Sequence, residues 1–222
     1  MSNFKKILLL CVALLSLNAA AFAEGIAVGG RIGTLGVGVE ATVGIFPTLN
    51  ARLGINKFNY SYDGTESDVD YDIDLNLDSW NALLDWYVLS SFHLTGGLLF
   101  NDNSLDVSAN LVPGKSYTIG EAKFSSSQIG TLQGSLDFEK SALYLGMGWG
   151  NPVEKDRFFS VNFDVGVVLQ GSPSASLTST GGAFSNNDFF KENLLKEEAD
   201  LEDAVDSFKY YPVLSLGIAF HF

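Results

Sequence analysis

Apolar and polar residues alternate along most of the chain, and the alternation is clearest in its last thirteen residues, 210–222. Apolar side chains occupy every second position from 214 to 222, and small or polar side chains fill the positions between them. A period of two places successive side chains on opposite faces of a β-strand. After residue 23, no segment reaches the roughly 20 consecutive apolar residues of a membrane-spanning helix. The pattern therefore predicts an all-β chain whose strands each have one apolar face.

Turn residues divide the alternating stretches into eight expected strands. The alternation changes phase at Gly33-Thr34, which indicates either a tight turn between two strands or a bulge in one long strand. We favour the turn, because only then is the number of strands even. A second change of phase at Asp78-Ser79 predicts a bulge within the fourth strand. The third, fourth and fifth strands are expected at 50–62, 68–87 and 92–111, the sixth ends at Trp149, and the seventh and eighth cover 159–170 and 210–222.

The connections between these strands fall into two classes of length. The short ones are 46–49, 88–91 and 150–157, and the longer ones are 63–68, 112–130 and 178–207. The two classes alternate along the chain, as they do in outer-membrane barrels with short periplasmic turns and longer extracellular loops. We expect an eight-stranded antiparallel transmembrane β-barrel with both termini in the periplasm.

The last long loop contains a pattern of a different period. Between Asp188 and Phe208, apolar residues recur at helical spacing and acidic residues fill the remaining positions. This pattern predicts one short extracellular helix. It has three interpretations: an amphipathic helix packed over the barrel rim, a lid or partner-binding helix, and an unstructured loop.

Residues 1–23 have the features of a secretory signal peptide. Lys5 and Lys6 precede an apolar run over residues 7–17, and Ala21-Phe22-Ala23 matches an A-x-A cleavage site. Cleavage would leave residues 24–222 as a single outer-membrane barrel domain. It would also remove Cys11, the single cysteine of the sequence, and with it any disulfide chemistry.

The expected mature segment, 24–222, is strongly acidic. It keeps 11 basic and 26 acidic residues, which gives a net charge of −15. This charge argues against nucleic acid as a partner, because phosphates require basic patches. It also argues against direct docking onto anionic lipid headgroups unless cations bridge the two. The partners we expect are outer-membrane lipid and lipopolysaccharide, around a monomeric barrel.

The C-terminal strand carries the most specific motif. Ile218, Phe220 and the terminal Phe222 alternate with small or polar residues, and this ending resembles the C-terminal signature of outer-membrane β-barrels. The resemblance implies recognition by the barrel-assembly machinery and a location in the outer membrane of a Gram-negative bacterium. With the strand pattern and the two classes of connection, the chain resembles the small eight-stranded barrels of the OmpA transmembrane domain, OmpX and OmpW group. That group includes structural anchors, adhesion-type proteins and narrow channels, so it implies no single activity.

An acidic ladder alternates with apolar residues from position 68 to position 78. Folding the fourth strand back onto the fifth places Asp78 opposite Asp102 and Asp74 opposite Asp106. Like charges opposed across strands are destabilising, and protonation, basic lumen residues or a bound cation would relieve the repulsion. The ladder is therefore either a hydrated acidic lumen and rim or a Ca²⁺ or Mg²⁺ site, and no other cofactor is expected. The candidate cation ligands are Asp72, Asp74, Asp78, Asp102 and Asp106.

Glu40 and Arg52 occupy lumen-facing positions on adjacent expected strands, which predicts an ion pair that helps to fill the barrel. Enzymes on this fold depend on histidine paired with serine or acidic residues, but the chain has only His93 and His221, and both are expected far from the outer rim. We expect no catalytic activity. The expected function is a structural or surface-interaction role through acidic extracellular loops, and the alternative is a narrow channel for small solutes.

Overall fold

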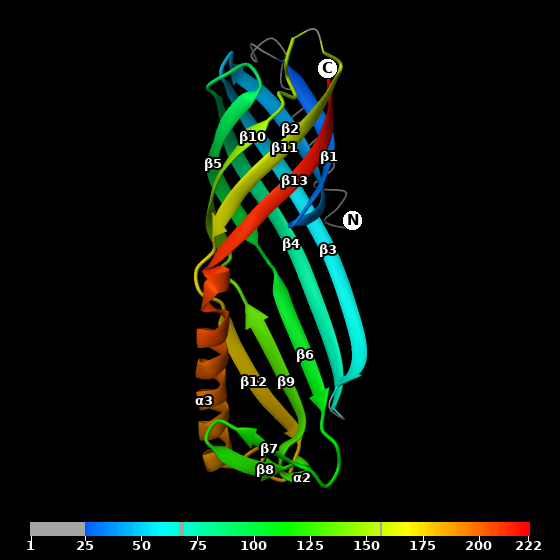
Figure 1. Ribbon diagram of the computed structural model, residues 1–222, viewed down its shortest axis with the longest axis vertical. Coiled ribbons are helices and arrows are strands. Elements are labelled where there is room, and N and C mark those ends of the chain that lie inside the picture. Colours follow the sequence, from blue (N-terminus) through cyan, green and yellow to red (C-terminus); the bar gives the residue numbers. More distant parts are fainter. Residues whose placement is uncertain (1–24, 67–68, 156) are drawn as a thin grey trace, which may run out of the picture.

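The computed structural model describes residues 25–66, 69–155 and 157–222. One end of the molecule is a closed ring of eight antiparallel strands (Figure 1), in which β13 pairs with β1 to complete the circle. This ring confirms the expected eight-stranded antiparallel barrel. The expected signal peptide, 1–23, lies outside the described residues. In order around the ring, the strands are β1 (Ile26–Gly33), β2 (Gly36–Phe46), β3 (Leu49–Glu66), β4 (Val69–Tyr87), β5 (Phe92–Asn101), β10 (Ser141–Trp149), β11 (Phe159–Leu169) and β13 (Tyr210–His221).

The first two ring strands are separate strands joined by a tight turn at Thr34-Leu35. They pair antiparallel up to Gly33 and Gly36. Gly36 has a φ of 100°, and a Cβ atom there would lie 2.7 Å from the carbonyl oxygen of Lys57. The turn interpretation is confirmed, and glycine permits the turn because it tolerates both the positive φ and the close backbone approach.

The short connections lie together at the end of the ring that holds the C-terminus. The amide of Gly150 donates to the carbonyl of Ser91, and the amide of His221 donates to the carbonyl of Phe158, both at 2.9 Å. The long connections lie at the opposite end (Figure 1). The expected division is confirmed for these connections, and the tight turn at Thr34-Leu35 is the exception, because it lies at the end of the long connections.

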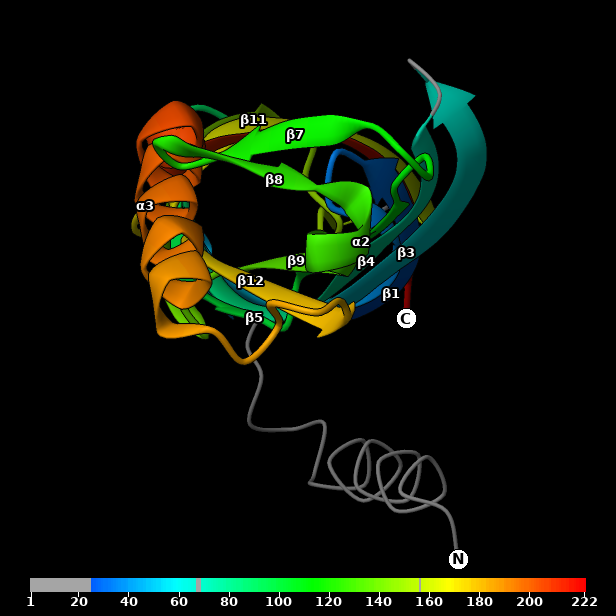
Figure 2. The ribbon, with the colours of Figure 1, turned by 90° about the horizontal axis from the view of Figure 1, so that it is seen from below.

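The long connections are more ordered than the sequence predicts, and together they form a second body that we call the extension. The segment 63–66, expected as a loop, continues β3, and β4 lengthens with it. Three further strands widen this hairpin in the order β4-β6-β9-β12 (Figures 1 and 2). The added elements are β6 (Ser104–Asn110), β7 (Ser116–Ile119), β8 (Ala122–Ser125), α2 (Ser126–Ile129), β9 (Gly130–Asp137), β12 (Ser174–Gly181), α3 (Asp188–Val205) and the 3₁₀ turn η2 (Asp206–Lys209).

The expected bulge at Asp78-Ser79 is wrong. β3 and β4 pair without a register shift from Leu49 opposite Trp86 to Glu66 opposite Val69. The backbone of β4 continues without a bulge, and the same face of the strand remains outward. The sequence pattern changes phase because the surroundings of each face change between the ring and the extension. In the ring, the outward face of β4 is apolar and exposed, as at Trp80. In the extension, the outward face carries the aspartates and the inward face carries the apolar residues.

The outward face of the ring is a broad exposed apolar surface. The side chains of Ile218 and Phe220 on β13, and of Phe222 directly after it, are exposed, whereas Val213 and Ala219 point inward and are buried. Apolar patches of this extent mark contact with lipid or with another protein. None of the helices in the described part of the chain is long and apolar enough to cross a membrane.

The predicted helix at 188–208 is present as α3 and runs along the extension beside β12 (Figure 1). Its apolar face buries Phe190 and Leu194 in a cluster with the β7–β8 hairpin. Glu198 and Glu202 accept hydrogen bonds from the backbone amides of Leu177 and Ala175 on β12, at 2.6 and 3.0 Å. The helix therefore covers the outer edge of the extension sheet, because its carboxylates satisfy amides that an edge strand leaves unpaired. It does not pack over the barrel rim.

Candidate functional site

A layer of buried charged side chains crosses the lumen of the ring. At its centre is Arg52 on β3, which is 2% exposed. Its guanidinium lies 2.6 Å from Asp85 Oδ2, 3.1 Å from Asp164 Oδ1 and 3.6 Å from Glu40 Oε2. β3 and β11 stand on opposite sides of the eight-membered ring, so the contact between Arg52 and Asp164 spans the full width of the lumen.

Arg31 and His93 complete this charged layer. The Arg31 guanidinium lies 2.8 Å from Glu40 Oε2 and 2.6 Å from Asp164 Oδ2. His93 Nε2 is 3.1 Å from Asp164 Oδ1. Ionic groups tolerate burial when each has close partners of opposite charge, and these contacts draw in side chains from six of the eight ring strands.

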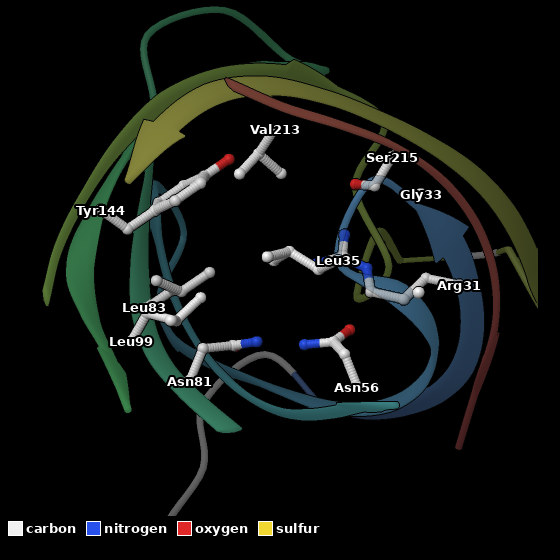
Figure 3. Close-up of a pocket in the computed structure, with 11 residues that line it drawn as sticks. Arg31, Gly33, Leu35, Asn56, Asn81, Leu83, Leu99, Tyr144, Val213 and Ser215 are labelled. Carbon is white, nitrogen blue, oxygen red and sulfur yellow. The ribbon is translucent and has the colours of Figure 1, made fainter. Parts of the chain in front are cut away.

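A second, apolar layer fills the lumen on the side of the extension. Leu83, Leu99, Tyr144, Val168 and Val213 form one buried cluster there. Figure 3 shows Tyr144, Leu83, Leu99 and Val213 pointing toward the barrel axis, across from Arg31 of the charged layer. A pocket of about 20 Å³, enough for about one water molecule, lies between this cluster, Arg31 and the turn between β1 and β2. Among the described residues, side chains therefore occupy the lumen at both levels.

The end of the ring near the C-terminus is also filled. Val153, from the connection between β10 and β11, folds into the lumen and packs against Ala27 and Ala219, and all three are buried. Beside it, Asn50 donates a hydrogen bond to the Asn151 side chain at 3.1 Å. These contacts fill the barrel between the charged layer and the short turns.

The acidic ladder lies on the outward face of the extension and not in the lumen, which corrects the expectation of an acidic lumen. The predicted register is confirmed, because Asp74 pairs with Asp106 across β4 and β6. Asp102 donates its amide to the carbonyl of Asp78 at 2.9 Å, and the exposed Asp78 carboxylate lies 3.0 Å from Lys57 Nζ. Among the described residues, no group of three or more His, Cys, Asp or Glu side chains is arranged to hold a metal ion. The Ca²⁺ or Mg²⁺ site, including Asp72, stays a prediction.

The outward face of the extension also carries a groove of about 370 Å³. Two parallel rows of polar side chains form its floor, and each row crosses β4, β6, β9 and β12. The first row is Asp74, Asp106, Ser135 and Ser176, and the second is Asp72, Ser108, Gln133 and Thr178.

Solved structures of two known proteins are similar to this architecture. The chain is similar to the crystal structure of Acinetobacter baumannii CarO2, with a TM-score of 0.59 and 22% identity over 89% of this chain and 98% of that one. Acinetobacter baumannii CarO gives a TM-score of 0.58 and 21% identity over the same shares. The chain has the fold of the small eight-stranded outer-membrane barrels. The attachment invasion locus protein Ail of Yersinia pestis, solved with a heparin analogue, aligns at a TM-score of 0.35 and 9% identity over 89% of this chain and 94% of that one. No protein-family model and no curated protein matches the chain.

The sequence indicated part of this site. It placed Glu40 and Arg52 in the lumen as partners, and the structure puts them 3.6 Å apart. It did not find Asp85, Asp164 or His93 as members of the same layer. One signal could have found them: each is ionisable and occupies an inward position on a strand whose alternate positions are apolar.

Proposed function

We propose that this protein is a non-enzymatic outer-membrane barrel of a Gram-negative bacterium that acts at the cell surface through its extension. The observation that carries the proposal is the closed lumen. A charged layer and an apolar layer of side chains occupy the ring, and the pocket between Arg31 and the apolar layer measures about 20 Å³. In this conformation the barrel is a membrane anchor, and the extension is the part available to partners.

The orientation follows from the lengths of the connections. The ring's short turns lie beside the C-terminus and correspond to periplasmic turns, and the extension corresponds to the extracellular loops. Ile218, Phe220 and Phe222 stay exposed on the closing strand, where the assembly machinery and the surrounding lipid would meet them. Lipopolysaccharide would then surround the base of the extension.

Two measurements test the proposal. The segment 24–222 contains no cysteine, so single cysteines report sidedness. A membrane-impermeant maleimide should label Ser127→Cys at the tip of the extension in intact cells and should leave Ser90→Cys, in a short turn, unlabelled. Refolded protein should give no single-channel openings in planar bilayers. Discrete openings from protein shown to be folded by its heat-modifiable gel mobility would support the narrow-channel alternative instead.

A further inference from the structure

The pocket between Arg31 and the apolar layer of the ring is lined by buried polar atoms that have no protein partner. These atoms are Ser215 Oγ on β13, Arg31 Nε on β1 and Asn81 Oδ1 on β4, and none of them has a hydrogen-bond partner among the described residues. Asn81 and Ser215 are only 2% and 8% exposed. Figure 3 shows both side chains pointing into the lumen, where Arg31 also lies. A buried polar group without a partner is costly, so three of them at one pocket indicate a bound molecule that pairs with them.

The three atoms come from both sides of the ring. Arg31 pairs with Gly217 across β1 and β13, and Gly33 pairs with Ser215, so Arg31 and Ser215 are diagonal neighbours on the inward face. Diagonal neighbours lie about 7–8 Å apart, a separation at which a small molecule can bridge two side chains. β4, which carries Asn81, stands opposite β13 in the ring. Asn81 therefore lines the pocket from the opposite wall.

The size and charge of the pocket limit what it can hold. Its volume of about 20 Å³ fits about one water molecule and excludes an organic solute. The Arg31 guanidinium lines the pocket and would repel a cation. That guanidinium already contacts Glu40 at 2.8 Å and Asp164 at 2.6 Å, and these two carboxylates would repel an anion. Water suits the pocket, because Arg31 Nε donates, Asn81 Oδ1 accepts and the Ser215 hydroxyl does both.

We propose that this pocket is a hydration site, in which bound water accepts a hydrogen bond from Arg31 Nε and also hydrogen-bonds to Ser215 Oγ and Asn81 Oδ1. Buried water typically makes about three hydrogen bonds to polar groups that the protein leaves unpaired. The bound water links side chains of three ring strands, β1, β4 and β13, at the junction of the charged and apolar layers. The inference is independent of the proposed function, because it concerns the inside of the ring and not the extension.

The first test detects the water in solution. Refolded protein in detergent micelles is studied by nuclear magnetic resonance, with cross-relaxation between water and side-chain amide protons as the readout. We expect a cross-peak between water and the Asn81 side-chain amide. Asn101 is the control, because it is similarly buried but its side chain hydrogen-bonds to Gln170 and to the backbone amide of Asn103. Absence of the peak at Asn81, or peaks of equal strength at Asn81 and Asn101, would overturn the proposal.

Two matched serine variants localise the water. Ser215→Ala removes one partner of the water and should weaken or abolish the cross-peak at Asn81. Ser160→Ala should leave that peak unchanged, because Ser160 has the same exposure as Ser215 but its hydroxyl accepts a hydrogen bond from Asn162. Heat-modifiable gel mobility checks that both variants are folded. An unchanged peak in Ser215→Ala would show that Ser215 does not hold the water, and the proposed site would be wrong.

Crystallography identifies the bound species. Crystals grown with sodium bromide or with rubidium chloride give an anomalous signal from a bound halide or alkali-metal ion, whereas water gives none. We expect electron density within hydrogen-bonding distance of Ser215 Oγ and Arg31 Nε, without an anomalous signal. A bromide or rubidium peak in the pocket would make it an ion site and would refute the proposal.

Discussion

Arg52 should contribute far more to stability than an exposed basic residue on the same strand. Replacing it with methionine keeps a side chain of similar length but leaves Asp85 and Asp164 buried without their shared cation. Breaking a buried ion pair in this way costs about 3–5 kcal/mol of unfolding free energy. Lys57 is the matched control, because it also lies on β3 and contacts an aspartate at 3.0 Å, but its side chain is 67% exposed. Lys57→Met should cost less than about 1 kcal/mol.

A double-mutant cycle separates the ion pair from the lost packing. Asp85→Asn preserves the shape of the carboxylate that lies 2.6 Å from Arg52 Nε. If the two charges interact directly, the double variant Arg52→Met/Asp85→Asn should be more stable than the sum of the single effects, by about 1–3 kcal/mol. Arg52→Lys keeps the charge without the planar fork and should fall between the wild type and Arg52→Met. This milder variant keeps the test informative if Arg52→Met does not fold.

The assay is denaturant unfolding of the barrel in lipid vesicles, followed by tryptophan fluorescence. Folding before each titration is checked by heat-modifiable gel mobility. A difference of about 2 kcal/mol between Arg52→Met and Lys57→Met corresponds to roughly a 30-fold change in the folding equilibrium, which such titrations resolve. Equal losses for the two variants, or additive effects in the cycle, would refute the argument that the charged layer is held together by its ion pairs.

Three further predictions concern other parts of the molecule. Gly148→Ala should destabilise the barrel, because a Cβ atom there would lie 2.5 Å from His93 Nε2. Gly96→Ala is the control, because a Cβ atom there meets nothing closer than 3.9 Å, and the unfolding midpoint of Gly148→Ala should be the lower of the two. Glu198→Ala should speed hydrogen exchange of the Leu177 amide on β12, because that amide donates to the Glu198 carboxylate. Glu198→Gln keeps an acceptor and should not speed the exchange. The hydrogen bond from Lys196 holds the pKa of the exposed Glu121 carboxyl below its ordinary value of 4.5. This contact between α3 and the β7–β8 hairpin should therefore be present above pH 4.5 and be lost as the pH falls through the lowered pKa of Glu121. In a carboxyl titration, Lys196→Met should raise the pKa of Glu121 again.

The strands of the ring could be predicted because they depend on local features of the sequence. Alternation identified the strands, and a turn at residues 88–91 fixed the register that brings Asp74 opposite Asp106. The charged layer was less predictable, because the contact between Arg52 and Asp164 joins strands on opposite sides of the ring. Strand pairing gives the neighbours of each strand, but it does not say which side chains meet across the lumen. The extension was missed because β6 and β9 were merged with the ring strands that precede or follow them.

The incorrect prediction of a bulge at Asp78-Ser79 shows what the alternation of apolar and polar residues means physically. Alternation reports which face of a strand meets an apolar environment, and β4 exchanges one environment for another on both faces where it passes from the ring into the extension. On β4 the outward face changes from Trp80 to Asp78, and on the neighbouring strand it changes from Phe100 to Asp102. The rings of Trp80 and Phe100 stack at 3.8 Å, so the change occurs at one level on both strands. From that level, six residues of strand to Asp74 span about 20 Å. The groove therefore lies beyond the apolar band of the ring, and the uninterrupted pairing of β3 with β4 fixes it there.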